Sequence, residues 1–147
     1  MRRYAITMLS LAGAVAFAQS NPAYIQFTPG AVKGALYKPD SGPAPHVASV
    51  LMHRTANFLS HIGAKELSIR GFLVLAMNPR SDDGEAMVRW EDNALDARIG
   101  VEFLCRQPDI PKVLLLGHSG GGPTTQTAHR NIRPGSKRSI SQLRLSV

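Results

Sequence analysis

The chain has 147 residues, which is the size of one domain and enough to bury a hydrophobic core. Its formal net charge is +7, but residues 19–128 contain ten Lys or Arg and ten Asp or Glu, so the excess positive charge lies at the two ends. A neutral body excludes the basic surface of a general nucleic-acid binder, and we expect no nucleic-acid partner.

The N-terminal segment, residues 1–18, has the pattern of a cleaved secretion signal. Arg2 and Arg3 precede an apolar run that ends in Ala16-Phe17-Ala18, the small-x-small sequence of a cleavage site. A buried N-terminal helix or a membrane anchor is the alternative, but the run is shorter than the roughly 20 residues that a membrane span needs. No later segment is long and apolar enough to cross a bilayer. We therefore predict a secreted, extracellular protein.

Five runs of strand length follow along the chain. "AYIQF" and "VKGALYKP" predict an opening hairpin, and the Gly- and Pro-rich "PDSGPAP" predicts a loop after it. "HVASVLMH", "GFLVLAMNP" and "KVLLLGH" are almost continuously apolar, as strands buried on both faces of a parallel sheet are.

Two helices are predicted between the parallel strands. The first extends from about Asn57, as N-cap, to about Arg70, with Gly71 in a left-handed turn at its end. The second spans about residues 89–106 and has an apolar stripe wide enough to lie on a sheet. The stripe consists of Trp90, Ala94, Ala97, Val101 and Leu104, with a flanking row of Leu95, Ile99 and Phe103.

The last apolar strand leads directly into Gly117-His118-Ser119-Gly120-Gly121, which fits the pattern G-x-S-x-G. A strand that turns at once into a helix holds its central residue in a strained conformation, and side chains at the flanking positions would collide. Ser119 is then presented at the edge of the sheet, and the N–H of Gly120 can donate to a developing oxyanion. A nucleotide-binding loop has the same glycine spacing, but Pro123 stands where its lysine would be. A purely structural turn is the other alternative.

With this motif the chain resembles the α/β-hydrolase fold, and more narrowly the serine hydrolases whose nucleophile follows a strand ending "LLGHSGGGP". The resemblance covers about residues 30–125, in which "GALYKP", "VLMHRTANF" and "RGFLVLAMNPR" come in the family's order. The fold class that it implies is a truncated α/β-hydrolase-type, mostly parallel sheet with flanking helices. We expect this partial domain to occupy residues 19–128.

The resemblance implies roles for individual residues. Ser119 would be the nucleophile and Gly120 would give one oxyanion-hole N–H, while His118 shapes the turn. The second N–H would come from Arg54 or Thr55 in the loop after "LMH", where the family often has Gly in place of Arg54. His53 would order this loop, and His46 and His61 carry no catalytic assignment.

The general base and its acid are missing downstream. The family uses a His oriented by an Asp or Glu, both C-terminal to the serine, but the last acid of this chain is Asp109. His129 would lie nine residues along the following helix, roughly 13 Å from the turn at 1.5 Å per residue, and pointing away. The acids at positions 82, 83 and 85 are expected in a solvated loop.

Residues 129–147 are basic, Ser-rich and without acids, so we expect a disordered basic tail. Without further strands, "KVLLLG" would be an exposed apolar sheet edge, through which the chain could self-associate.

By lineage we expect a secreted serine acyl hydrolase, esterase- or lipase-like, that acts on a small ester-like substrate but is weakly active or inactive without the acid and His. Two alternatives stay open. One is a non-catalytic binding module with a basic C-terminal arm, and the other is a subunit completed by another chain. No His, Asp and Glu cluster has the spacing of metal ligands, so we expect neither a metal nor an organic cofactor.

Overall fold

The fold is built around one six-stranded sheet with the strand order β1-β2-β4-β3-β5-β6. The computed structural model describes residues 21–28, 31–81, 86, 88–131 and 139–145, so the signal segment at residues 1–18 lies outside the described residues. The strands are β1 (Ala23–Gln26), β2 (Lys33–Tyr37), β3 (Val47–Met52), β4 (Leu73–Asn78), β5 (Lys112–His118) and β6 (Ser139–Leu145).

The centre of the sheet is parallel, as predicted. β3 pairs in parallel with β4 on one side and with β5 on the other. Strand β1 and strand β2 form the predicted antiparallel hairpin, and β2 joins the sheet antiparallel to β4. All six residues of β4 and the last five of β3 are buried, which explains why their sequences are continuously apolar rather than alternating.

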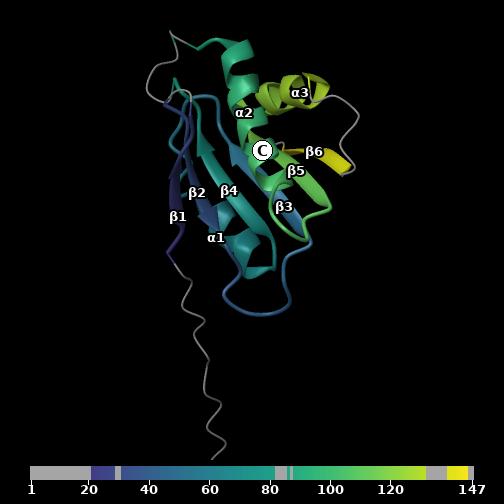
Figure 1. Ribbon diagram of the computed structural model, residues 1–147. Coiled ribbons are helices and arrows are strands. Elements are labelled where there is room, and N and C mark those ends of the chain that lie inside the picture. The colour runs from purple at the N-terminus through teal and green to yellow at the C-terminus, as the bar shows by residue number, and fades with distance from the viewer. Residues whose placement is uncertain (1–20, 29–30, 82–85, 87, 132–138, 146–147) are drawn as a thin grey trace, which may run out of the picture.

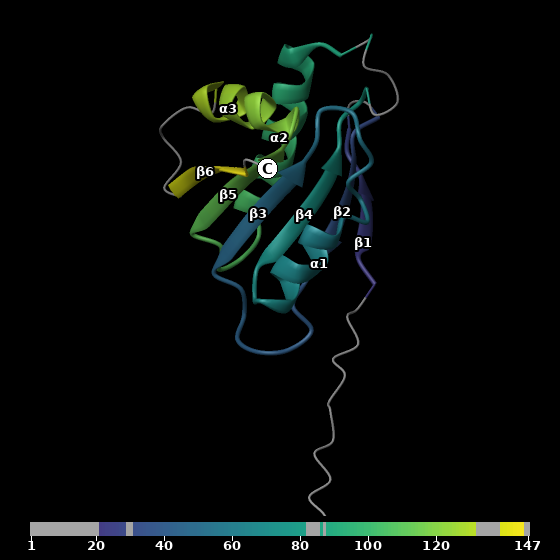
Figure 2. The ribbon, with the colours of Figure 1, turned by 180° about the vertical axis from the view of Figure 1, so that it is seen from behind.

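The three helices of the described residues cover the two faces of this sheet (Figures 1 and 2). Helix α1 (Ile62–Ile69) lies on one face, where its Ala64 packs among residues such as Leu51 and Val74. Helices α2 (Trp90–Cys105) and α3 (Gly121–Asn131) lie on the other, where Val101 and Ala128 pack among residues such as Val50. Neighbouring residues of a strand thus serve opposite cores, as the two-residue period requires.

The first helix begins later than predicted. Residue His61, not Asn57, is the N-cap of α1, and its Nδ1 accepts a hydrogen bond from the N–H of Gly63. The side chain of Asn57 instead closes a local turn by accepting from the N–H of Leu59. Gly71 ends the helix with a φ of 91°, as expected.

The second helix buries most of the predicted apolar face, together with residues that were not predicted to be buried. Its apolar stripe faces the sheet except at Trp90, which is exposed. In the flanking row, Ile99 and Phe103 pack against the core as predicted, but Leu95 is 47% exposed. The row that is buried beside the stripe consists of Asn93, Asp96 and Gly100. Two polar side chains were not recognised as buried because polar residues are normally found on the solvent side of an amphipathic helix.

The segment after the serine also departs from the prediction. Helix α3 extends through residues 129–131, and residues 139–145 form β6, which pairs in parallel with β5. The expectation of a disordered tail is therefore wrong for these two stretches. Pairing satisfies the backbone N–H and C=O groups along β5. Because these bonds use only the backbone, they do not depend on which side chains the added strand carries. Since β5 has a partner on each side, it is not the sheet edge through which self-association was predicted.

None of the described helices is long and apolar enough to cross a membrane.

The two leucines Leu115 and Leu95 test which residues form the core. Leu115 is fully buried in β5, so Leu115→Ala removes core packing and leaves a cavity, which lowers the free energy of unfolding by about 2–5 kcal/mol. The same substitution at exposed Leu95 changes it by less than about 0.5 kcal/mol. Urea denaturation of both variants measures the difference, and equal losses would contradict the orientation of α2.

Candidate functional site

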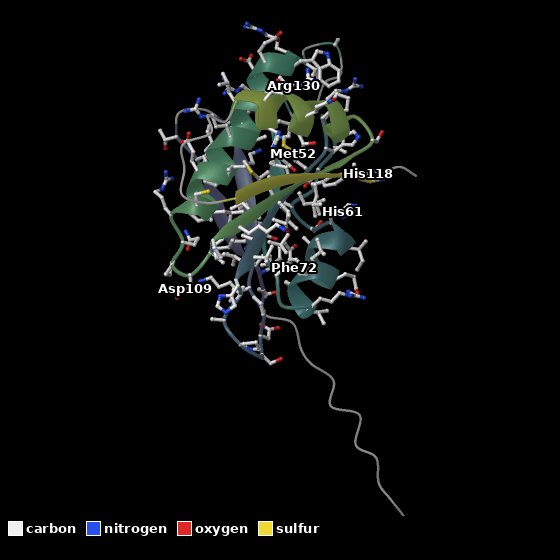
Figure 3. The ribbon with its side chains drawn as sticks, turned by 90° about the vertical axis from the view of Figure 1, so that its right-hand side faces the viewer. Met52, His61, Phe72, Asp109, His118 and Arg130 are labelled. Atoms are coloured by element: carbon white, nitrogen blue, oxygen red, sulfur yellow. The ribbon has the colours of Figure 1, made fainter. Side chains whose placement is uncertain are left out.

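The site lies where the parallel strands β3, β4 and β5 end. Their last residues are Met52, Asn78 and His118, and the carboxyl ends of parallel strands share one edge of a sheet. Figure 3 shows Met52 and His118 toward the same end of the molecule, with Phe72 and Asp109, which precede β4 and β5, toward the other. The loops after these three strands are therefore neighbours.

Ser119 occupies a tight turn between β5 and α3. Its φ is 50°, and the only other non-glycine residue with positive φ among those described is Asp109. The N–H of Gly122 donates to the carbonyl oxygen of Ser119 at 3.0 Å, which closes the turn, and Ser119 is exposed. The serine therefore stands at the sheet edge in a conformation that L-residues adopt at a cost of about 1–3 kcal/mol.

Two glycines make this turn sterically feasible. A Cβ at Gly117 would overlap the backbone of Gly121, and a Cβ at Gly121 would overlap the carbonyl oxygen of Met52. The end of β5, the start of α3 and the end of β3 thus approach each other at van der Waals distance. These contacts confirm the prediction that a side chain at either position would collide with its surroundings.

The loop of residues 53–61, which joins β3 to α1, is fixed by hydrogen bonds from several elements. Within the loop, His53 Nδ1 accepts from the N–H groups of Thr55 at 3.1 Å and Ala56 at 2.9 Å. The buried Asn78 at the end of β4 accepts from the N–H of Phe58 at 2.7 Å. Tyr37 of β2 donates its hydroxyl to the carbonyl of Leu59 at 2.7 Å. The predicted role of His53 in ordering this loop agrees with these bonds.

Arg54 connects this loop with the serine turn. Its carbonyl oxygen accepts a 2.9 Å hydrogen bond from Nδ2 of the fully buried Asn93 in α2. Its side chain lies along Gly120, where an added Cβ would be 3.0 Å from Arg54 Cβ, and its guanidinium carbon lies 5.3 Å from the ring centre of Trp90. The structure thus brings together Arg54, Ser119 and Gly120.

A cluster of rings lies beside the same turn. Phe58 stacks on His61 with ring centres 4.3 Å apart, and on His53 at 5.6 Å. The ring of His118 is 6.2 Å from that of His61 and 6.0 Å from that of Phe58. Burial lowers the pKa of His61, and the electrostatic effect of His118 lowers it further. His118 thus packs beside the turn, the kind of position expected for a residue that shapes it.

The loop after β4 is held by a buried carboxylate. Asp96 of α2 is fully buried and accepts from Arg80 through Nε at 3.0 Å, Nη2 at 2.6 Å and the backbone N–H at 2.9 Å. Such bidentate, charge-assisted pairs fix geometry as well as charge. The start of the third loop at the site edge is therefore anchored to α2.

The remaining sequence candidates lie apart from the turn or outside the described residues. His129 is exposed in the last turn of α3, and His46 is exposed before β3. The acids at positions 82, 83 and 85 lie outside the described residues. The described residues contain no group of three His, Cys, Asp or Glu side chains that could hold a metal ion.

Three supporting side chains were missed by the sequence analysis: Asn78, Asn93 and Asp96. A signal existed for each of them. Asn78 is the one polar residue of an otherwise apolar strand, and Asn93 and Asp96 are three residues apart on one side of a helix. Polar residues in otherwise buried patterns indicate buried hydrogen bonds.

Comparison with known proteins supports the fold rather than a particular relative. No family model and no curated protein matches the chain. Among solved structures, Est1E from Butyrivibrio proteoclasticus covers 74% of this chain with a TM-score of 0.60 at 16% identity, over 45% of its own length. The serine hydrolase XC6422 from Xanthomonas campestris covers 83% of this chain with a TM-score of 0.63 at 20% identity, over 61% of its own length.

A third structure, the dienelactone hydrolase-like phosphotriesterase P91 from metagenomic libraries, covers 87% of this chain with a TM-score of 0.65 at 18% identity. Across the three structures, the chain spans 45% to 61% of the other protein's length. The likeness to esterases and serine hydrolases shows that the chain has a partial α/β-hydrolase fold.

The cap of α1 makes stability depend on pH. The pKa of His61 is lower in the folded chain than its ordinary value of about 6.5, so below that pH the unfolded chain binds more protons and the free energy of unfolding decreases. His61→Asn keeps a capping oxygen that does not titrate. We expect the variant to lose less stability than the wild type between pH 7.5 and about pH 5.5, measured by urea denaturation. His46→Asn, at an exposed position, is the control, and identical pH profiles for wild type and His61→Asn would contradict the account.

The hydrogen bond from Asn93 to Arg54 is expected to hold the loop of residues 53–61. Asn93→Ala leaves a carbonyl oxygen without this donor, which lowers the free energy of unfolding by about 1–3 kcal/mol and speeds amide exchange at Thr55 and Ala56. Asn57→Ala, an exposed residue of the same loop, is the matched control with a loss of about 1 kcal/mol or less. Unchanged amide exchange in the Asn93 variant would show that the loop does not depend on this contact.

Proposed function

We propose that this chain, with its partial α/β-hydrolase fold, belongs to a serine hydrolase of carboxylic esters and that Ser119 is its nucleophile. The observation that carries the proposal is the turn itself: an exposed serine with a φ of 50° between a buried parallel strand and a helix, at the carboxyl edge of the sheet. Such a turn aims the serine Oγ away from the sheet toward a bound ester. Several of the similar solved structures are named as esterases.

We assign the oxyanion hole to two backbone N–H groups, those of Gly120 and Arg54. Gly120 directly follows the nucleophile, and the Arg54 side chain packs against it. Of the two candidates in the loop after β3, we choose Arg54 because it is the one that packs against Gly120, while Thr55 donates its N–H to His53 Nδ1. The hydrogen bond from Asn93 holds the carbonyl of Arg54, in the peptide that follows the donor N–H, and so restrains the position of Arg54. Donors that need no rearrangement stabilise the tetrahedral intermediate most effectively.

In the proposed reaction, Ser119 Oγ attacks the ester carbonyl carbon and the alcohol leaves, which gives an acyl-serine that water then hydrolyses. His129 is exposed at the far end of α3, and we assign it no role as a base. The hydroxyl proton of Ser119 passes to solvent water, and the leaving alkoxide takes up a proton from water. We therefore propose a weak activity that rests on the oxyanion donors and substrate binding, on the order of 10³ to 10⁴ over water.

We also propose that the protein is secreted, because residues 1–18 carry the pattern of a cleaved signal. N-terminal sequencing of the exported chain tests this proposal, with Gln19 expected as the first residue. Retention of the chain inside the cell, with residues 1–18 still attached, would contradict it.

Covalent trapping tests the nucleophile. After reaction with p-nitrophenyl acetate, peptide mapping by mass spectrometry is expected to find one acetyl group on Ser119 in the wild type and in the control Ser41→Ala, an exposed serine of the loop before β3. Ser119→Ala is expected to carry none. An acetyl group on another serine, or equal acetylation of Ser119→Ala, would overturn the assignment.

A further inference from the structure

The side chain of Arg54 has a feature that the oxyanion assignment does not use. A backbone N–H can come from almost any residue, yet this position carries a guanidinium directly beside the serine turn. The side chain extends along Gly120, with its Nε 3.3 Å from where a Cβ of Gly120 would stand. Because Gly120 has no side chain, nothing from that residue separates Arg54 from the neighbouring Ser119.

The Arg54 side chain is also restrained by neighbouring residues. Its guanidinium carbon lies 5.3 Å from the ring centre of Trp90, a cation–π distance, and the carbonyl of Arg54 is bound by the buried Asn93. A guanidinium binds carboxylates by two parallel hydrogen bonds, and a side chain restrained on both sides loses less entropy when it does so.

From these contacts we infer that Arg54 selects esters that carry a free carboxylate close to the scissile carbonyl, such as half-esters of short dicarboxylic acids. This inference rests on the proposed function and adds a substrate class to it. The carboxylate binds the side chain of Arg54 while the ester carbonyl lies at Ser119, with its oxygen toward the N–H of Gly120.

The kinetic test compares two substrates on each protein: p-nitrophenyl hydrogen succinate, which is anionic, and p-nitrophenyl butyrate, which is neutral. Arg54→Gln keeps the backbone N–H for both, so the ratio of their kcat/KM values isolates the side chain. We expect this ratio to fall about tenfold or more in Arg54→Gln, the effect of losing a charge-assisted hydrogen bond. The fall should be smaller in Arg54→Lys, which keeps the positive charge but not the paired N–H donors of a guanidinium. An unchanged ratio in Arg54→Gln would overturn the inference.

Arg70→Gln is the matched control. It removes the same charge from the C-cap of α1, which leads to the start of β4 at the other end of the sheet, and we expect it to keep the wild-type ratio. A fall in this variant equal to that in Arg54→Gln would mean that net charge, not Arg54, sets the preference, and would also overturn the inference.

A binding measurement separates this inference from the proposed function. Trp90 is the sole tryptophan of the chain and touches Arg54, so its fluorescence reports on the guanidinium without any turnover. At constant ionic strength, monomethyl succinate is expected to give a saturable change in the wild type that is absent in Arg54→Gln, while neutral dimethyl succinate gives none. The same response to both compounds, or no response, contradicts carboxylate binding even if esters are hydrolysed. If monomethyl succinate changes the Trp90 fluorescence but Ser119 is never acylated, the proposed function is rejected while carboxylate binding at Arg54 is supported.

Discussion

The tight passage from β5 into α3 is the constraint on which the site depends. A strand buried on both faces ends at His118, and a helix begins only three residues later at Gly121, so the chain reverses direction within one strained residue, Ser119. The strain of about 1–3 kcal/mol is tolerated because both flanking elements are packed into the sheet. At the point of closest approach Gly117 meets Gly121, and Gly121 meets the end of β3. The exposure of the serine is a consequence of this packing.

The second constraint is the loop after β3, which has no regular hydrogen-bond ladder and is held by side chains instead. Asn78 and Tyr37 bind it from neighbouring strands, and Asn93 binds it from the helix on the opposite face. A loop fixed from several elements keeps its N–H groups in place, which is what stabilisation of a developing charge requires. The same anchoring places the Arg54 side chain between Gly120 and Trp90, so the position of the proposed anion site and that of the proposed oxyanion donors follow from the same contacts.

The sequence predicted the parts of the fold that depend on long apolar patterns and on glycine. The parallel strands, the hairpin and the turn at Ser119 follow from continuous apolar runs and from the Gly117 and Gly121 spacing. The start of α1 was not predicted correctly, because Asn57 is the better N-cap by propensity. The use of His61 as the N-cap depends on the stacking of its ring with Phe58. The buried Asn93 and Asp96 depend on partners 39 and 16 residues away, which no local pattern contains. Strand β6 was missed because edge pairing uses backbone groups common to every sequence.

The central claim is that the turn places Ser119 Oγ opposite the N–H groups of Gly120 and Arg54. A crystal structure of the protein after reaction with a dialkyl p-nitrophenyl phosphate tests this claim most directly, since the bound phosphoryl group imitates the tetrahedral intermediate. The account predicts a phosphorus bonded to Ser119 Oγ, with one phosphoryl oxygen about 2.7–3.1 Å from both backbone nitrogens. A phosphoryl oxygen that points away from these two groups, or a Ser119 without positive φ, would contradict it.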